Sequence, residues 1–181
     1  DRPWPPRLSR RGERAHRAAW REFWLESAVE LADRRLEKKW YRANYQLAIN
    51  AKPGAATPGL FGVSLPYDCP PWRGDRHNNY PEVACTFWGS YVANHLNHAL
   101  NFTELVERLL PWGRQIAREV YECDGIALGH ITFERMKRPY MDNLWSRTLY
   151  VTAAYVQNLW WHYRYSGDRA YLHRIYPILA A

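Results

Sequence analysis

The residues whose types and spacing best suit chemistry lie in the segment 72–82, close to two tryptophans, Trp72 and Trp88. The segment follows neither a helical nor a strand period. Its hydrogen-bonding side chains include Asp75, His77, Asn78, Asn79 and Glu82. One interpretation is an ordinary solvated turn. The density of donors and acceptors beside tryptophan favours a second one, a loop at the start of a helix that binds a sugar.

Within this loop, each side chain allows two roles. A carboxamide such as Asn79 is a poor base, and it positions a water molecule for attack only if a carboxylate polarises it. Glu82 is the nearest carboxylate in sequence, and it is either that base or a favourable negative charge at the start of the next helix. His77 either hydrogen-bonds a sugar hydroxyl or fixes the loop through its backbone. Asp75 lies between two arginines, which favours an ion pair over catalysis, and we retain it as a substrate-binding candidate.

Trp72 and Trp145 lie in expected loops, and with Trp88 they are candidates for stacking on the face of a sugar ring. The sequence has no Gly-x-Ser-x-Gly elbow, no phosphate-binding glycine loop and no Cys/His metal spacing. We therefore expect no covalent nucleophile, no metal and no cofactor.

Composition and charge narrow the classes of partner. The chain has 181 residues, is 47% hydrophobic and carries a net charge of +7. Seven arginines against two acidic residues put +5 of that charge in positions 1–21, so the other 160 residues carry only +2. A basic groove with interleaved aromatic residues is not visible, and we expect no nucleic-acid partner. No run approaches the roughly 20 apolar residues of a membrane span.

Helical spacing of apolar residues predicts an all-α fold, either a toroid or a bundle. Asp33 is the expected N-cap of the second helix, and Pro111 is expected to kink or split the fourth. A short strand is predicted at 60–65, and irregular segments at 66–81 and 129–143. The expected helices cover 15–24, 34–50, 83–98, 103–124, 146–165 and 168 to the end.

The domain organisation predicted from these patterns is a basic, proline-rich lead-in at 1–14 and a catalytic domain at 15–181. Both ends of the chain look cut, because no initiator Met precedes Asp1 and an apolar helical pattern stops at Ala181 without a cap. We expect the domain to be incomplete, with the remainder of its own catalytic domain as a partner. The compartment stays open, since no signal peptide is visible.

A series of short motifs along the chain resembles the catalytic domain of glycoside hydrolase family 95 and its relatives. The resemblance runs from about Ala18 to the end. Its motifs are Trp20-x-x-Phe23-Trp24-x-x-Ser27, Tyr41-x-x-x-Tyr45-x-Leu47-Ala48, Pro58-Gly59-Leu60-Phe61-Gly62, Trp72-x-Gly74-Asp75-x-His77-x-Asn79-Tyr80, Phe87-Trp88-Gly89, Asn94-His95 and Leu159-Trp160-x-His162-Tyr163-x-Tyr165-Ser166-Gly167-Asp168.

The resemblance implies part of an (α/α)6 toroid and an inverting α-L-fucosidase or α-L-galactosidase that acts on an oligosaccharide or other glycoside. It places Asn79 at the first position of an Asn-x-Asn pair, whereas the second position is Pro81, a departure from the pattern. His130 resembles a family position that faces the site, with a solvated loop histidine as the alternative. The resemblance implies a Glu as general acid and an Asp that orients the water-activating Asn. Both follow the family's Tyr-Pro-x-Leu helix, so we expect the 181 residues to be inactive alone. Family relatives often look secreted or periplasmic.

Two other functions stay open at this point. One is a related (α/α)6 enzyme with different sugar chemistry, such as a phosphorylase, whose turnover depends on inorganic phosphate. The other is a carbohydrate-binding helical domain without catalysis, which would bind sugar but not turn it over.

Overall fold

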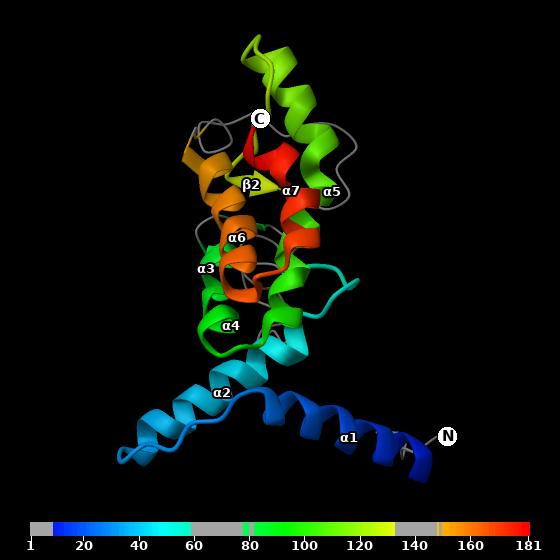
Figure 1. The fold of residues 1–181 in the computed structure, drawn as a ribbon, viewed down its shortest axis with the longest axis vertical. Coiled ribbons are helices and arrows are strands. Elements are labelled where there is room, and N and C mark those ends of the chain that lie inside the picture. Colours follow the sequence, from blue (N-terminus) through cyan, green and yellow to red (C-terminus); the bar gives the residue numbers. More distant parts are fainter. Residues whose placement is uncertain (1–8, 59–77, 80–81, 133–147, 149) are drawn as a thin grey trace, which may run out of the picture.

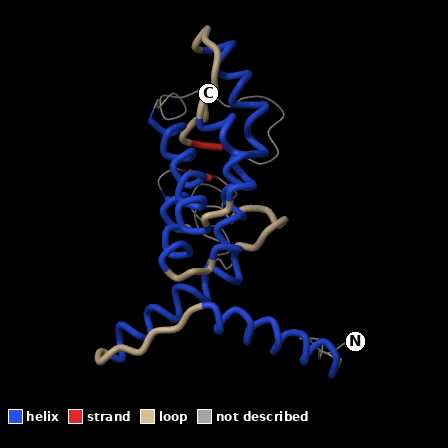
Figure 2. The backbone as a smooth tube through the Cα atoms, viewed as in Figure 1, coloured by secondary structure: helices blue, strands red, loops and turns tan. Residues whose placement is uncertain are grey.

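The computed structural model describes residues 9–58, 78–79, 82–132, 148 and 150–181. Over these residues the chain is almost entirely helical, as predicted, and none of the described helices is both long and apolar enough to span a bilayer. The sole described β-structure is one antiparallel pair of two-residue strands (Figure 2). The elements are α1 (Arg10–Glu26), α2 (Arg34–Asn50), β1 (Asn78–Asn79), α3 (Glu82–Thr86), α4 (Trp88–Val92), α5 (Leu96–Val120), β2 (Ile131–Thr132), α6 (Tyr150–Ser166) and α7 (Arg169–Leu179).

Local side-chain caps begin three of the helices. The Asp33 carboxylate accepts hydrogen bonds from the backbone N–H groups of Arg35 and Leu36, at the start of α2. Asp168 does the same for Ala170 and Tyr171 at the start of α7. Such caps satisfy N–H groups that the helix itself leaves unpaired. Both predicted starts are confirmed, and α1 begins at Arg10 after a Ser9 cap, inside the segment 1–14.

The prediction of one helix over 83–98 is wrong. The chain there forms α3, then α4, and then the first turn of α5. The first break is at Phe87, whose side chain is fully buried, and the second includes Asn94, which has φ 57°. Asparagine tolerates this left-handed conformation better than most residues. Two short helices with a turn between them keep the same spacing of apolar residues, and periodicity alone does not separate the two cases.

The predicted helix start at Thr103 is also wrong, because α5 is one helix of 25 residues in which Thr103 lies well inside. The Thr103 hydroxyl donates to the carbonyl of Leu100 instead of capping a turn. Pro111 lies within α5 without dividing it, although proline removes one helical hydrogen bond. Ten buried residues on α5 provide the packing that offsets this cost.

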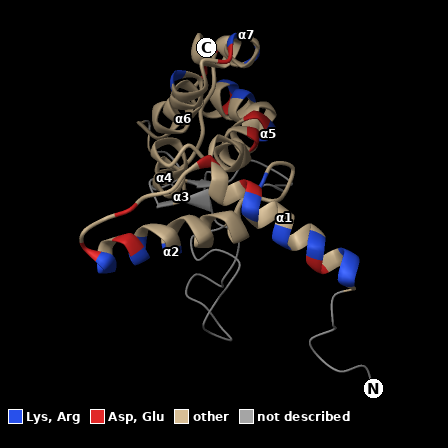
Figure 3. Cartoon of the chain, turned by 60° about the horizontal axis from the view of Figure 1, so that its bottom comes forward, with Lys and Arg blue, Asp and Glu red and all other residues tan. Residues whose placement is uncertain are grey.

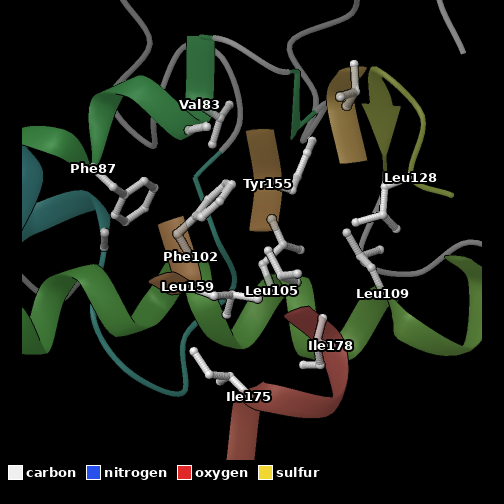
Figure 4. Close-up of a cluster of buried hydrophobic side chains, with 14 of the residues drawn as sticks. Val83, Phe87, Phe102, Leu105, Leu109, Leu128, Tyr155, Leu159, Ile175 and Ile178 are labelled. Atoms are coloured by element: carbon white, nitrogen blue, oxygen red, sulfur yellow. The ribbon is translucent and has the colours of Figure 1, made fainter. Parts of the chain in front are cut away.

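The hydrophobic core lies around α5, with α6 and α7 packed along it and α3 at one side (Figure 4). Phe102 of α5 is its centre, since its ring lies 5.3 Å from Phe87 and is stacked 5.4 Å from Tyr155 of α6. Ile175 and Ile178 of α7 close the core on the other side of α5. This core determines where the loops at its surface lie.

Helices α1 and α2 extend away from this core at one end of the molecule (Figure 1). Aromatic rings join them to each other, with Trp20 stacked on Tyr45 at 5.0 Å. They join the core at a corner where Phe23 of α1 stacks on His95 at 3.9 Å. The His95 Nδ1 also lies 3.0 Å from the Glu26 carboxylate.

Candidate active site

The structure brings together two segments that the sequence singled out separately. Strand β1, which contains Asn78 and Asn79, pairs antiparallel with β2. Asn79 lies opposite Ile131 and Asn78 lies opposite Thr132. Since His130 directly precedes β2, its backbone is one residue from the partner of Asn79. These are the backbones of two of the predicted site segments, and they meet at one edge of the core.

Helix α3 fixes the first of these segments from its C-terminal side. Glu82 is the first residue of α3, and β1 contacts this helix. Val83, Ala84 and Phe87 are buried in the core, so α3 cannot shift without opening it. Glu82 follows Asn79 by three residues in sequence, and both of its predicted roles stay predictions.

Helices α5 and α6 fix the second segment. The N–H of Leu128 donates to the Thr152 hydroxyl of α6 at 2.8 Å, and the N–H of Ala127 donates to the carbonyl of Gly113 of α5 at 3.0 Å. Gly113 allows this close approach, because a Cβ there would lie 2.6 Å from a methyl carbon of Ile126. His130 follows two residues later, and its Nδ1 atom is buried.

The segment before the polar loop is fixed by a residue that the sequence reasoning missed. Asn101 is fully buried on α5, and its amide donates to the carbonyls of Lys52 at 2.7 Å and Ala55 at 2.9 Å. The N–H of Gly54 donates to the Glu104 carboxylate at 2.8 Å. Two signals in the sequence point to the role of Asn101. Its carboxamide lies on the apolar face of a helix, and a Pro-Gly turn earlier in the chain has backbone groups that need hydrogen-bond partners.

Trp88, predicted to bind substrate, lies at the start of α4 and packs edge-to-face against Trp161 of α6 at 5.1 Å. Its ring remains partly exposed, and its contact with substrate stays a prediction. The structure describes the backbone of Asn78, Asn79 and Glu82. The other candidates, Trp72, Asp75, His77 and Trp145, lie outside the described residues, as do the predicted strand at 60–65 and Pro81. The structure does not test their roles.

In the described part of the chain, no group of three or more His, Cys, Asp or Glu side chains is placed to hold a metal ion. The residues that pair in β1 and β2 are Asn78 with Thr132 and Asn79 with Ile131. In sequence, His130 directly precedes β2 and Glu82 begins α3. The role of these residues toward a sugar or a water molecule stays a prediction.

Comparison with known protein families assigns the chain to one of them. Residues 11–181 match the family model described as the glycosyl hydrolase family 95 catalytic domain. None of the curated proteins compared with the chain matches it. The match covers nearly the whole chain, and the catalytic domain of this family is an (α/α)6 toroid. The chain therefore belongs to glycosyl hydrolase family 95, and the helices α1 to α7 are part of its catalytic domain.

Proposed function

We propose that this domain hydrolyses α-L-fucosides or closely related glycosides such as α-L-galactosides, with inversion, and that Asn79 positions the attacking water. The observation that carries the proposal is the β1–β2 pair, which aligns Asn79 with Ile131 and thus with the segment of His130. The chain belongs to a glycoside hydrolase family, so a glycoside is the substrate class. The choice of sugar rests on the resemblance of the motifs around Asn79.

Inverting hydrolysis places two requirements on such a site. A general acid protonates the leaving oxygen while an activated water attacks from the other side of the sugar, with the two groups about 6.5–9.5 Å apart. Asn79 holds the water through its amide oxygen, and a carboxylate must take up the proton. In the family the general acid is a Glu that follows the Tyr-Pro-x-Leu helix. That helix is α7 here, because Tyr176, Pro177 and Leu179 lie in it.

Glu82 is the carboxylate that we assign to the water side. It lies three residues after Asn79, at the start of α3. Replacement of Glu82 by Gln removes the negative charge and keeps the shape of the side chain, so it distinguishes the two roles. If Glu82 takes up the proton, E82Q abolishes hydrolysis and leaves the melting temperature nearly unchanged. If it acts only on the helix dipole, E82Q keeps its activity and loses about 0.3–1 kcal/mol of stability.

The test of the proposal is Asn79→Ala in the catalytic domain that contains this chain, assayed on aryl α-L-fucosides and α-L-galactosides. We expect kcat to fall by about 10²–10⁴-fold with an unchanged melting temperature. Gln157→Ala removes an exposed carboxamide on α6, and as the matched control it should keep the wild-type rate. Wild-type turnover by the Asn79→Ala variant would exclude this residue from the site.

One observation favours a second candidate function. Pro81 occupies the second position of the Asn-x-Asn pair, and proline has neither a carboxamide nor an N–H to hold water. A domain that binds glycans without hydrolysing them accounts for this departure. Binding of oligosaccharides without release of monosaccharide, in the presence and absence of inorganic phosphate, would support it. Turnover that requires phosphate would instead identify a phosphorylase.

A further inference from the structure

Four arginines form a row along one exposed side of α1, and we call this set the arginine row. They are Arg10, Arg14, Arg17 and Arg21, and every one of these residues is exposed. At 3.6 residues per turn the four positions lie within about 60° around the helix, and at 1.5 Å per residue they extend for about 16 Å along it. Figure 3 shows the basic positions recurring along α1, which extends away from the core (Figure 1).

Most of the charge in the arginine row is not neutralised by its own helix. Glu13 pairs with Arg17 at 2.7 Å. The other three arginines form no ion pair with another residue that the structure describes. The two remaining carboxylates of α1 are placed elsewhere, since Glu26 lies 3.0 Å from His95 and Glu22 has no arginine three or four residues away. The row therefore presents three positive charges that the described part of the fold leaves unpaired.

This arrangement opposes the stability of the helix that carries it. Successive members of the row are three or four residues apart, and like charges at these spacings destabilise a helix. Arg10 and Arg11 also lie in the first turn of α1, where the helix dipole favours negative and disfavours positive charge. Because α1 buries only Phe23, packing offers little to offset these costs. Residues that break local rules without a compensating gain in the fold indicate a function, here the binding of an anionic partner.

We propose that the arginine row of α1 binds an anionic polysaccharide through carboxylate or sulfate groups along one chain. Guanidinium groups form paired hydrogen bonds with carboxylates and phosphates, and a sulfate presents the same kind of charged oxygen atoms. A row of separate cations matches a linear polyanion better than it matches one compact anion. The chain belongs to a glycoside hydrolase family, so a glycan is the polymer that this domain meets. The proposal rests on that membership and not on the role of Asn79.

The surroundings of the row favour a polysaccharide over the two other common polyanions, a lipid surface and a nucleic acid. A helix that lies on a membrane inserts large apolar side chains opposite its basic face, whereas the opposite side of α1 carries Gly12, Ala15 and Ala19. Unstructured nucleic acids stack their bases on free aromatic rings. The tryptophans beside the row, Trp20 and Trp24, instead pack against two tyrosines of α2.

The experiment measures binding of fluorescently labelled polygalacturonate, dextran sulfate and neutral dextran to the 181-residue chain, at low and at physiological ionic strength. We expect at least one charged polymer to bind, with an affinity that falls steeply with salt, and neutral dextran not to bind. The double variant Arg14→Gln/Arg21→Gln should weaken binding by at least about tenfold at low salt. Arg114→Gln/Arg118→Gln removes two exposed arginines of α5 and the same net charge, and as the matched control it should weaken binding less than about threefold.

Equal weakening by the two double variants would reduce the effect to net charge and would overturn the proposal. Failure of both charged polysaccharides to bind, or tighter binding of a DNA duplex or of phosphatidylserine vesicles, would overturn it too. The melting temperature is a second readout, because removal of mutually repelling charges should keep or raise it. A clear decrease in Arg14→Gln/Arg21→Gln would assign these arginines to the stability of the fold instead. Binding is measured without turnover, so failure here leaves the proposed role of Asn79 unaffected.

Discussion

The helices α5, α6 and α7 are packed as a protein core, whereas α1 and α2 are attached as an edge. Ten residues of α5 and six of α6 are buried, but α1 buries only Phe23 and α2 only Asn44 and Leu47. Figure 3 shows α1 with arginines spread over much of its length. Burial of apolar surface is the main source of stability, so the fold depends on the first region. The second can be perturbed with less effect on the whole.

The candidate active site depends on the first region, because the segment of His130 is fixed by Gly113 of α5 and Thr152 of α6. By contrast, α1 and α2 meet the core at one corner, through Phe23, Glu26 and His95. We therefore expect substitutions in α5, α6 and α7 to lower the free energy of unfolding more than comparable substitutions in α1 and α2.

The largest difference between core and edge is expected for a matched pair of Phe→Ala substitutions. Phe102→Ala empties the centre of the core and should cost about 3–5 kcal/mol of unfolding free energy. Phe23→Ala removes the same atoms at the corner, where 8% of the side chain is already exposed. We expect it to cost about 1.5–3 kcal/mol, the transfer free energy alone. Urea denaturation measures both, and equal losses would contradict the division into core and edge.

A smaller effect should show how the core positions the candidate active site. Thr152→Val keeps the size of the side chain and leaves the buried N–H of Leu128 without its acceptor. We expect a loss of about 1–3 kcal/mol and a fall in glycosidase activity, because the segment before His130 loses its contact with α6. Ser27→Ala, which removes a half-buried hydroxyl at the end of α1, is the control at the edge. Full activity in Thr152→Val would show that α6 does not position this segment.

The smallest expected effect is on pH dependence. Burial is the main cause that lowers the pKa of His162, while Asp168 acts to raise it and Arg174 to lower it. The unfolded state therefore binds a proton near pH 6.5 that the folded state does not yet bind. Stability should be constant above about pH 7 on account of this group and fall as the pH drops below about 6.5, by at most about 1.4 kcal/mol per pH unit.

His162→Phe should remove this contribution to the slope. Thermal melts between about pH 7.5 and pH 5 measure it, and an unchanged slope in the variant would assign the pH dependence to other groups. A smaller slope in the variant would show that a group in the core, His162, contributes to the pH dependence of stability.

Features that depend on neighbours in sequence were predicted correctly. The caps at Asp33 and Asp168 each act within three residues, and both helices begin where expected. The errors arose where tertiary burial decides, as in the turn at Asn94 and the unbroken path of α5 through Pro111. The order of motifs indicated the family, which the comparison confirms.

The arrangement of the candidate site was harder to predict. Asn79 and His130 were both named from the sequence, but nothing in either segment shows that β1 pairs with β2. The pairing depends on contacts made elsewhere, such as the close approach of Gly113 to Ile126. A glycine within a helix gives no sign of which chain segment crosses it. Contacts of this kind, between residues far apart in the sequence, are not predictable from a single sequence.

The pairing of β1 with β2 also has a consequence for the order of folding. Asn79 and Ile131 lie 52 positions apart (131 minus 79), so their contact closes a long loop for the gain of a two-residue ladder. Closing this loop costs conformational entropy, and the few hydrogen bonds of the two-residue ladder offset that cost only after the loop has closed. Helix α5 lies within the loop and α6 supplies Thr152, so both should form first. We expect the β1–β2 pair to form late in folding and to be the first to open on unfolding.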